Sequence, residues 1–137
     1  MKFTNRQFGE LEVEEQHVLH FPEGIIGFEE YRKFLIVHDE DSEPFRWLVS
    51  LEDAELSFPL LDPTLLIPDY DKRLRAAGET SIFVIATLNE NVEESTLNLR
   101  SPIVIDETRT GRQIVLEDES LQLQFPLIPT ASIEERG

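Results

Sequence analysis

The run IFVIATL, residues 82–88, is the stretch that decides the fold of this chain. It is the longest apolar run without a charge, and it is rich in β-branched and aromatic side chains. Such a run, bounded by polar residues, is typical of a strand that is buried on both faces. It is also far too short to cross a bilayer as a helix. The stretch therefore predicts a buried strand in a soluble protein.

Similar patterns continue on either side of this run. ELEVEE at residues 10–15 and TLNL at residues 96–99 alternate apolar and polar side chains, as half-buried strands do. The other predicted strands are VLHF (18–21), FLIV (34–37), RWLVSL (46–51), LSFPLL (56–61), PIVI (102–105) and RQIVL (112–116). FLIV is a second continuous apolar run, so we expect it to be buried on both faces.

Turn signals separate the strands at near-regular spacing, which predicts an all-β barrel or sandwich. The signals are Phe8-Gly9, Asp39–Pro44, Asp62-Pro63, Asn89–Asn91 and Thr110-Gly111. Helix is scarce: we expect one turn over Phe28–Lys33 and two turns over Tyr70–Ala77, which Gly78 would end. The sequence thus predicts one small antiparallel β-barrel-like domain over residues 1–137, with minimal helix.

The connections carry their own predictions. PIVIDETRTGRQIVL at residues 102–116 reads as a hairpin with Asp106–Gly111 as its loop. Proline cannot donate to a central ladder, so Pro59 and Pro126, which lie inside apolar runs, predict sheet edges or bulges. Edge strands of this kind can accept a strand from a partner.

The stretch FPEGIIGF, residues 21–28, allows a phosphate-binding loop or a simple turn. A phosphate loop needs several glycines that close onto a helix, usually with a lysine. Here no lysine follows directly, and Glu23 and Glu29 would repel a phosphate. We therefore expect a tight turn, with its glycines in conformations that side chains disfavour and with Phe21 and Phe28 in the core.

Charge is the strongest fact of the composition. Asp and Glu number 28 against 12 Lys and Arg, which gives a net charge of −16. Such a surface repels phosphate backbones and anionic membranes, and it attracts and steers a basic partner. A charge of this sign also simply keeps a protein soluble. Cysteine is absent, and the N-terminus has no apolar run typical of a signal peptide, so we expect a cytoplasmic protein.

No pattern points to catalysis or to a metal. His17 and His20 form H-x-x-H, but in a strand this spacing places them on opposite faces. HDEDSE, residues 38–43, has no glycine-centred loop of the calcium-binding kind and reads as a solvated acidic loop. No serine lies in an elbow such as G-x-S-x-G. We expect no catalytic residues, no metal and no cofactor.

The segment FPLLDPTLLIPDYD, residues 58–71, is apolar, holds three prolines and ends in an Asp-Tyr-Asp cluster. Its proline density prevents regular pairing, so we expect some of its apolar side chains to be exposed. An apolar patch rimmed by acids is a plausible partner site. Alternatively, its leucines cover one end of the barrel. LQLQFPLIP, residues 121–129, reads as a final strand or a docked tail.

With these stretches in view, the chain resembles the FliW family of flagellar assembly factors over nearly its whole length. Four stretches carry the resemblance, in the family's order: EEQHVLHFPEGIIGFEEYRKFLIV (14–37), PFRWLVSLEDAELSFPLLDP (44–63), PDYD (68–71) and STLNLRSPIVIDETRTGRQIVL (95–116). One departure is that only KRLRAAGETS, residues 72–81, separates PDYD from the next strand, where the family usually has a longer, often helical segment.

The resemblance implies a small β-barrel-like fold, no catalysis and two protein partners. One is flagellin, held in the cytoplasm before export; the other is CsrA, a repressor of translation that binds mRNA. In the family the two compete, so that export of flagellin frees the factor to sequester CsrA. No direct nucleic-acid or membrane contact is implied, and the factor is expected to be a monomer. A general chaperone that binds amphipathic helices without a regulatory role is the alternative.

The resemblance and the composition of residues 58–71 together select the expected partner contacts. These are Phe58, Asp62, Asp69, Tyr70 and Asp71. A tyrosine near the centre of such a patch is the kind of residue that contributes strongly to binding. Asn98 and Arg100 match the family's NLRSP motif, and their alternative role is to shape the strand.

Overall fold

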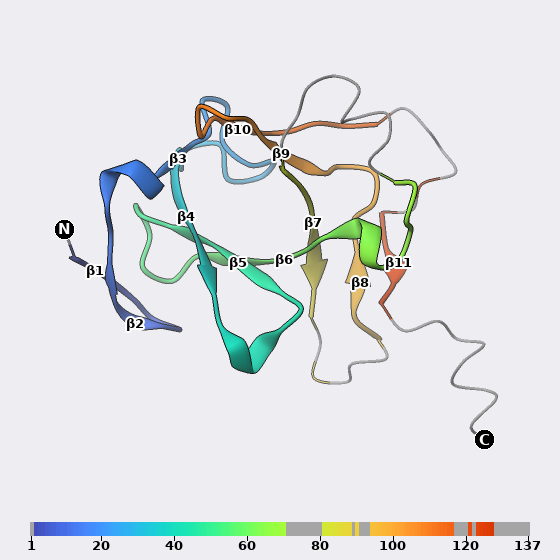
Figure 1. Cartoon of the computed structure of the whole chain (residues 1–137), viewed down its shortest axis with the longest axis horizontal. Coiled ribbons are helices and arrows are strands. Elements are labelled where there is room, and N and C mark those ends of the chain that lie inside the picture. The colour runs from blue at the N-terminus through green and yellow to red at the C-terminus, as the bar shows by residue number, and fades with distance from the viewer. Residues whose placement is uncertain are drawn as a thin grey trace.

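The computed structural model describes residues 2–70, 81–88, 90, 94–116, 121 and 123–127. Its strands are β1 (Lys2–Asn5), β2 (Gly9–Glu12), β3 (Leu19–His20), β4 (Lys33–His38), β5 (Arg46–Ser50), β6 (Ser57–Leu61), β7 (Ser81–Thr87), β8 (Thr96–Leu97), β9 (Ile103–Ile105), β10 (Gly111–Gln113) and β11 (Phe125–Pro126) (Figure 1). Three 3-10 helices lie between them: η1 (Glu15–His17), η2 (Glu40–Ser42) and η3 (Pro63–Leu65). The described residues contain no α-helix, and their strand ladders are antiparallel. The predicted all-β antiparallel fold is confirmed.

Strand β7, predicted from IFVIATL, joins the parts of the sheet. Its first residues, Ser81–Phe83, pair with β9, and its last, Ala86 and Thr87, pair with β8. Between them Val84 and Ile85 pair with β6. One strand thus pairs with three neighbours, β6, β8 and β9, because different residues along β7 form the hydrogen bonds to each of them.

The long sheet runs in the order β10-β9-β7-β6-β5-β4-β3, and it curls so that its two ends approach each other (Figure 1). One isolated bridge joins His20 of β3 to Thr110, and the His20 N–H donates to the Arg109 carbonyl at 2.9 Å. Pro22, which has no N–H, follows closely, and β3 is only two residues long. Within the described residues the ladder therefore does not close into a complete barrel. A barrel-like domain was predicted, and the structure has a curled open sheet.

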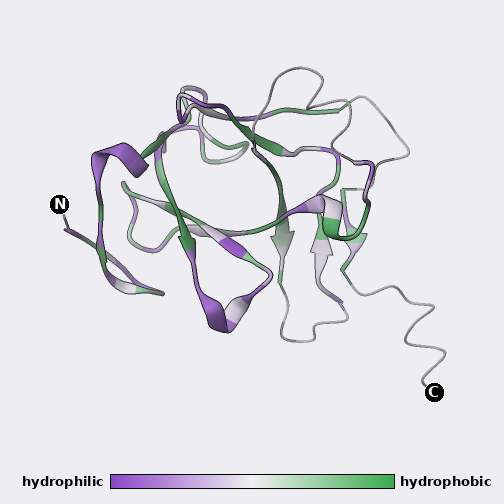
Figure 2. Ribbon diagram, in the orientation of Figure 1, coloured by the Kyte–Doolittle hydropathy of each residue, from purple (hydrophilic) through white to green (hydrophobic). Residues whose placement is uncertain are grey.

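Both faces of β7 are packed, as its sequence predicted. Ile82, Val84 and Ala86 are buried on one face, while Phe83 and Ile85 pack on the other, against the cluster that includes Phe21 and Phe34. The hydrophobic colour of Figure 2 follows β7 and β9 through the middle of the molecule. Burial on two faces explains why this strand carries no charge, since a charge on either face would lose its hydration.

Strand β4 divides the core in the same way. Phe34 faces the central cluster and stacks edge-on against Phe21, with ring centroids 5.1 Å apart. The next residue, Leu35, faces the opposite side and packs with Val13 and Val18. The hairpin β1–β2 contributes to this outer layer through partly buried side chains such as Leu11. The predicted shared face of ELEVEE is confirmed; β1 is an addition to the predicted strands.

The hairpin prediction is also confirmed, and the proline prediction holds for Pro126 but not for Pro59. β9 pairs with β10 around a loop that begins at Asp106, although Gly111 belongs to β10 and not to the loop as predicted. Pro126 lies in β11, which pairs only with β8 among the described strands. Pro59 lies just before the two residues of β6 that pair with β7. Pro126 thus lies on an edge strand, as predicted, whereas Pro59 pairs with Trp47 inside the β5–β6 ladder of an inner strand, so the sheet edge or bulge predicted for Pro59 is not observed.

The stretch FPEGIIGF forms a tight turn rather than a phosphate site. Gly24 and Gly27 have φ of 69° and 88°, in the region that favours glycine. The Gly24 N–H donates to the Phe21 carbonyl at 2.9 Å, and the Phe28 N–H donates to the Ile25 carbonyl at 2.7 Å. Phe21 is fully buried, as predicted.

Two details of this region were predicted wrongly. Phe28 is 37% exposed and forms an isolated bridge with Ile25, so it is not a core residue. No helix forms over Phe28–Lys33: the chain makes a single hydrogen-bonded turn, in which the Tyr31 N–H donates to the Phe28 carbonyl at 3.1 Å, and Lys33 already begins β4. Of the helix expected over Tyr70–Ala77, only Tyr70 is described and it lies in a turn; the rest and Gly78 lie outside the described residues.

The two turn glycines allow a matched test of this geometry. A Cβ on Gly24 would lie 2.5 Å from the Glu29 Cα, whereas a Cβ on Gly27 would meet nothing within 4 Å. We expect Gly27→Ala to lower the free energy of unfolding by about 1 kcal/mol through its positive φ alone. Gly24→Ala adds a clash with backbone and should lower it by about 3 kcal/mol. Urea unfolding of both variants measures the difference, and equal losses would contradict the tight turn.

Candidate functional site

The predicted partner segment, residues 58–71, is described up to Tyr70. It continues β6 into η3, where the Asp62 carboxylate caps the helix by accepting from the Thr64 N–H at 2.9 Å and the Thr64 hydroxyl at 2.6 Å. Leu60 and Leu61 are buried, whereas Leu65 is 59% and Leu66 is 41% exposed. Each of the two predicted alternatives therefore holds for one part of the segment. The leucines of β6 belong to the core, and the leucines at η3, Leu65 and Leu66, lie at the surface.

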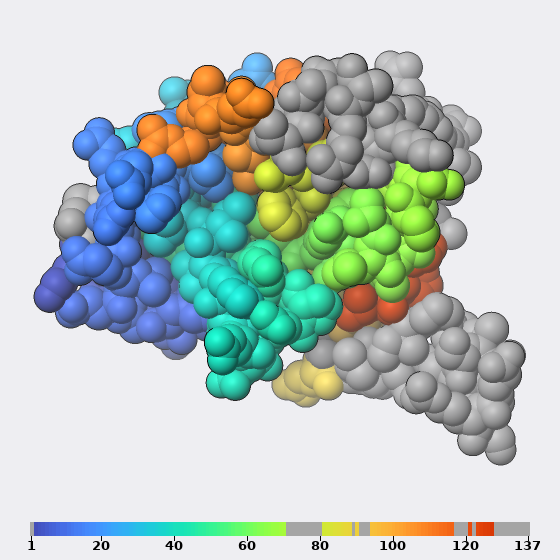
Figure 3. All heavy atoms as spheres, in the orientation of Figure 1, coloured from blue at the N-terminus to red at the C-terminus, as the bar shows by residue number. Residues whose placement is uncertain are grey.

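We call the exposed residues Leu65, Leu66, Pro68 and Asp69 the η3 patch. Figure 3 shows this part of the chain, in green, on the surface above the red C-terminal strand β11. Underneath, Ile67 and Tyr70 pack on the same buried cluster as Phe125 and Leu127 of the C-terminal segment. Of the two alternatives predicted for residues 121–129, a final strand or a docked tail, the structure has the strand: β11 pairs with β8, and its Phe125 packs under the patch.

Tyr70 has a structural role in this arrangement. Its phenol is half-buried, and its hydroxyl donates to the Leu99 carbonyl. Burial raises the pKa of the Tyr70 phenol well above its usual range, so the group stays neutral and keeps its proton for this hydrogen bond. The tyrosine joins η3 to the strand region after β8.

The remaining predicted residues do not gather at one point. Asp62 lines a cavity of about 420 Å³ together with Glu43, Arg46 and Leu65. Phe58 lines a different cavity, and Asp69 is exposed on the η3 patch. Asp71 lies outside the described residues. The structure therefore distributes the predicted contacts over two surfaces instead of one.

The cavity at Phe58, here called the Phe58 groove, has a volume of about 470 Å³. It is lined by Ile25, Ile26, Phe58, Ile85, Thr87, Thr96, Asn98, Ser101, Gln113, Leu123 and Gln124. The Phe58 ring stacks edge-on against Phe28 with centroids 5.2 Å apart. Ile26 is 58% exposed and Leu123 is 53% exposed, so two large aliphatic side chains stand at the groove in contact with water.

The sequence analysis missed Ile26, Phe28 and Leu123 as surface residues. Ile26 and Phe28 belong to the turn FPEGIIGF. Its residues are mostly apolar, and apolar residues are usually expected in the core when only the sequence is known. The predicted turn could have shown that Ile26 and Phe28 are exposed, because side chains at the tip of a tight turn project outwards. The Ile26 N–H also receives support from a distant residue, donating to the Gln113 side-chain carbonyl at 2.9 Å.

Asn98 and Arg100 shape the chain, in line with the structural alternative for the NLRSP motif. The Asn98 side-chain carbonyl accepts from the Arg100 and Ser101 N–H groups, both at 3.1 Å. The Arg100 guanidinium donates from Nε to the Leu121 carbonyl at 3.2 Å. Asn98 also lines the Phe58 groove, so this turn sets one wall of it.

Two further checks concern metals and membranes. The described residues contain no group of three or more His, Cys, Asp or Glu side chains placed to hold a metal ion. None of the helices among these residues has the length and apolar character that crossing a membrane requires.

Tyr70→Phe tests whether Tyr70 acts as a structural residue. The variant keeps the ring and leaves the buried Leu99 carbonyl without its donor, so we expect the free energy of unfolding to fall by about 1–2 kcal/mol. Partner affinity should stay within about twofold, because the hydroxyl points inwards. Thermal unfolding measures the first and calorimetric titration with the partner the second. A large loss of affinity with unchanged stability would instead make Tyr70 a binding contact.

Comparison with known proteins agrees with this architecture. The family model described as FliW protein matches residues 2–127. The flagellar assembly factor FliW of Caldanaerobacter subterraneus subsp. tengcongensis is 36% identical over 140 aligned residues, which cover 93% of each chain. The protein of the same name from Thermosipho africanus is 37% identical and covers 93% of this chain and 95% of its own.

A solved structure extends the similarity to three dimensions. A crystal structure of the flagellar assembly factor FliW matches with a TM-score of 0.81 at 29% identity, covering 94% of this chain and 98% of the other. The match thus covers nearly the whole chain rather than one motif. The chain belongs to the FliW family of flagellar assembly factors, a family of non-enzymatic proteins.

Proposed function

We propose that this protein binds flagellin in the cytoplasm before export and also binds and antagonises the translational repressor CsrA. Flagellin synthesis is thereby coupled to flagellin export. The observation that carries the proposal is membership of the FliW family over residues 2–127. The chain acts as a binding module, and its partner contacts include the exposed parts of residues 58–71.

The Phe58 groove suits the flagellin side of the proposal. Terminal segments of flagellin are amphipathic helices, which require an apolar surface before assembly. The groove offers Ile26, Phe58 and Leu123 to the apolar face of such a helix. Polar side chains in its lining, such as Gln113 and Thr96, are available to the polar edge. The η3 patch, with Leu65 and Asp69, is a second apolar surface beside an acid.

The charge of the chain suits the CsrA side. A protein that binds RNA carries basic surface, and a net charge of −16 attracts such a surface and repels its RNA. Acidic partners of this kind owe much of their association rate to long-range steering, which salt screens.

Calorimetric titration with flagellin and with CsrA from the same organism, each repeated in the presence of the other, tests the proposal. Saturable binding of both partners, with each weakening the other, is the expected result. Absence of heat with both partners would overturn it. Equal affinity for unrelated amphipathic helices would instead favour a general chaperone.

The flagellin contact can be tested with a matched pair of surface variants. Ile26 and Val115 are 58% and 60% exposed, and only Ile26 lines the Phe58 groove. We expect Ile26→Ser to weaken flagellin binding about tenfold, since it removes an aliphatic contact, and Val115→Ser to leave it within about twofold. Calorimetry gives both affinities. If the two variants behave alike, the Phe58 groove does not bind flagellin.

Salt provides an independent test of the CsrA contact. Raising the salt concentration from about 0.05 M to 0.5 M shortens the Debye length from roughly 14 Å to 4 Å. We expect the affinity for CsrA to fall at least about tenfold, whereas the affinity for flagellin, which rests on apolar contact, should change much less. A CsrA affinity that does not depend on salt would contradict an electrostatic contact.

A further inference from the structure

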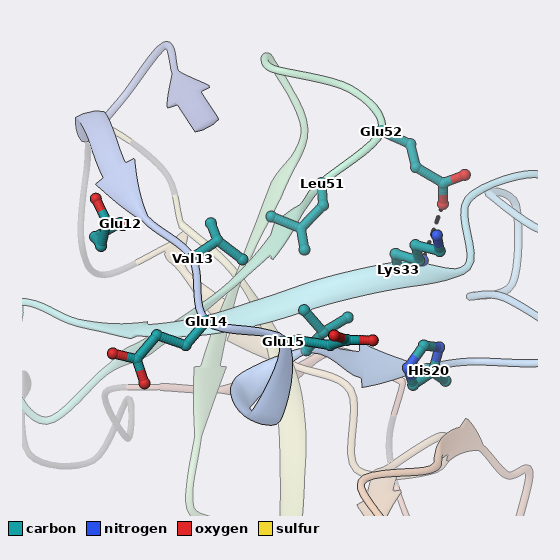
Figure 4. A pocket seen from close by; sticks show the side chains of 9 residues that line it. Glu12, Val13, Glu14, Glu15, His20, Lys33, Leu51 and Glu52 are labelled. Atoms are coloured by element: carbon teal, nitrogen blue, oxygen red, sulfur yellow. Dashed lines mark hydrogen bonds between the residues drawn. The ribbon is translucent and has the colours of Figure 1, made fainter. Parts of the chain in front are cut away.

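An apolar groove lies on the face of the sheet away from Phe58. Its volume is about 670 Å³, and we call it the Val13 groove. It is lined by Glu12, Val13, Glu14, Glu15, Val18, His20, Lys33, Leu51 and Glu52. Figure 4 shows Val13 and Leu51 at its centre, with the labelled glutamates around them. A volume of this size falls in the range of pockets that hold small-molecule ligands, roughly 300–1,000 Å³.

The floor of the groove is the outer apolar layer of the sheet. Val13 and Val18 are buried and pack with Leu35, while Leu51 is half-buried beside them. Leu35 points away from the central cluster that holds Phe34 and Phe58, because successive side chains of a strand alternate. The sheet therefore separates the Val13 groove from the Phe58 groove, and the two linings share no residue.

The rim is acidic and comes from two directions. Glu12, Glu14 and Glu15 lie at the end of β2 and the start of η1, and Glu52 lies in the turn after β5. On the cationic side the lining holds Lys33, with His20 as a titratable neighbour. Four carboxylates thus outnumber the one lysine of the lining, while the Arg109 guanidinium, which donates to the Glu15 carbonyl at 3.1 Å, lies beside the rim.

Glu52 is held in place and ionised. Its carboxylate oxygen Oε1 accepts from the Arg32 N–H at 2.6 Å and from the Lys33 N–H at 2.9 Å. These two backbone hydrogen bonds lower the pKa of Glu52 below its usual value. Glu14 has a local partner as well, accepting from the Gln16 amide at 2.8 Å. The charge on these sides of the groove therefore has a fixed position.

This combination selects the chemistry of an occupant. The apolar floor favours an aliphatic side chain, because removing apolar surface from water is favourable, and the rim favours cations that flank this side chain. An acidic peptide, a nucleic acid and an anionic membrane are all repelled. We propose that the Val13 groove binds a segment of the basic partner in which one aliphatic residue lies between lysines or arginines.

This inference rests on the proposed function, in which that basic partner is CsrA. It adds that CsrA and flagellin use separate faces of the sheet: the Val13 groove takes CsrA and the Phe58 groove takes flagellin. Any mutual exclusion then arises from the bulk of the partners or from a change in the sheet, and not from competition for one groove.

The test is the double variant Glu14→Gln/Glu15→Gln in the full chain. Its matched control is Glu40→Gln/Asp41→Asn, which removes two charges from the exposed helix η2, beyond the other end of β4. At low salt we expect the first variant to bind CsrA about tenfold more weakly and the control to stay within about twofold. Both should bind flagellin as the unmodified chain does, and thermal unfolding checks that both fold.

A short peptide tests the apolar floor separately. Lys-Lys-Leu-Lys-Lys should displace CsrA at a concentration several-fold lower than Lys-Lys-Ser-Lys-Lys, which has the same charge. Equal displacement by the two peptides would leave only charge attraction and overturn the groove.

The remaining outcomes separate the two proposals. If the unmodified chain binds CsrA and Glu14→Gln/Glu15→Gln binds it equally well, the Val13 groove is refuted and the proposed function stands. Parallel loss of CsrA and flagellin in this variant would also refute separate surfaces. No binding of CsrA to the unmodified chain overturns the proposed function itself.

Discussion

The structure depends on the burial of both faces of β7. Its odd and even side chains enter different apolar clusters, and its edges pair with β6, β8 and β9. A strand packed on two faces tolerates no charge on either, and it fixes the position of every neighbour that pairs with it. The curl of the long sheet, the hairpin β9–β10 and the docking of β11 all follow from this position.

The same two-sidedness gives the sheet two grooves with different linings. The apolar interior of the curled sheet opens at the Phe58 groove, and the outer apolar layer opens at the Val13 groove. One is lined by uncharged side chains and the other is rimmed by glutamates. A thin sheet thus presents different chemistry on its two sides, which suits a non-enzymatic protein that acts by binding.

Much of the candidate site could not be predicted from the sequence, because its residues are apolar and such residues are usually expected in the core. Ile26 and Phe28 lie in an apolar turn, and only the backbone of Gly24 and Gly27 turns these side chains towards water. Leu60 and Leu65 are equally apolar, yet the first lies in a ladder and the second on η3. Tyr70 stands between two aspartates in the sequence and was predicted to contact a partner. In the structure its hydroxyl points inwards and donates to the Leu99 carbonyl. Hydropathy alone does not separate these cases, since exposure depends on which strand covers a residue.

The sequence by itself determined most of the strands and turns, the acidic character and, through its order of motifs, the family. These features are local: alternation, β-branched runs, glycine and proline positions and net charge act over a few residues or over the whole chain. Only the tertiary structure decided that Glu12, Glu14, Glu15 and Glu52 lie around one apolar floor and that Phe58 lies on the opposite face. The physical reason is that grooves arise where segments distant in sequence meet, and register and curl, which no short stretch encodes, fix those meetings.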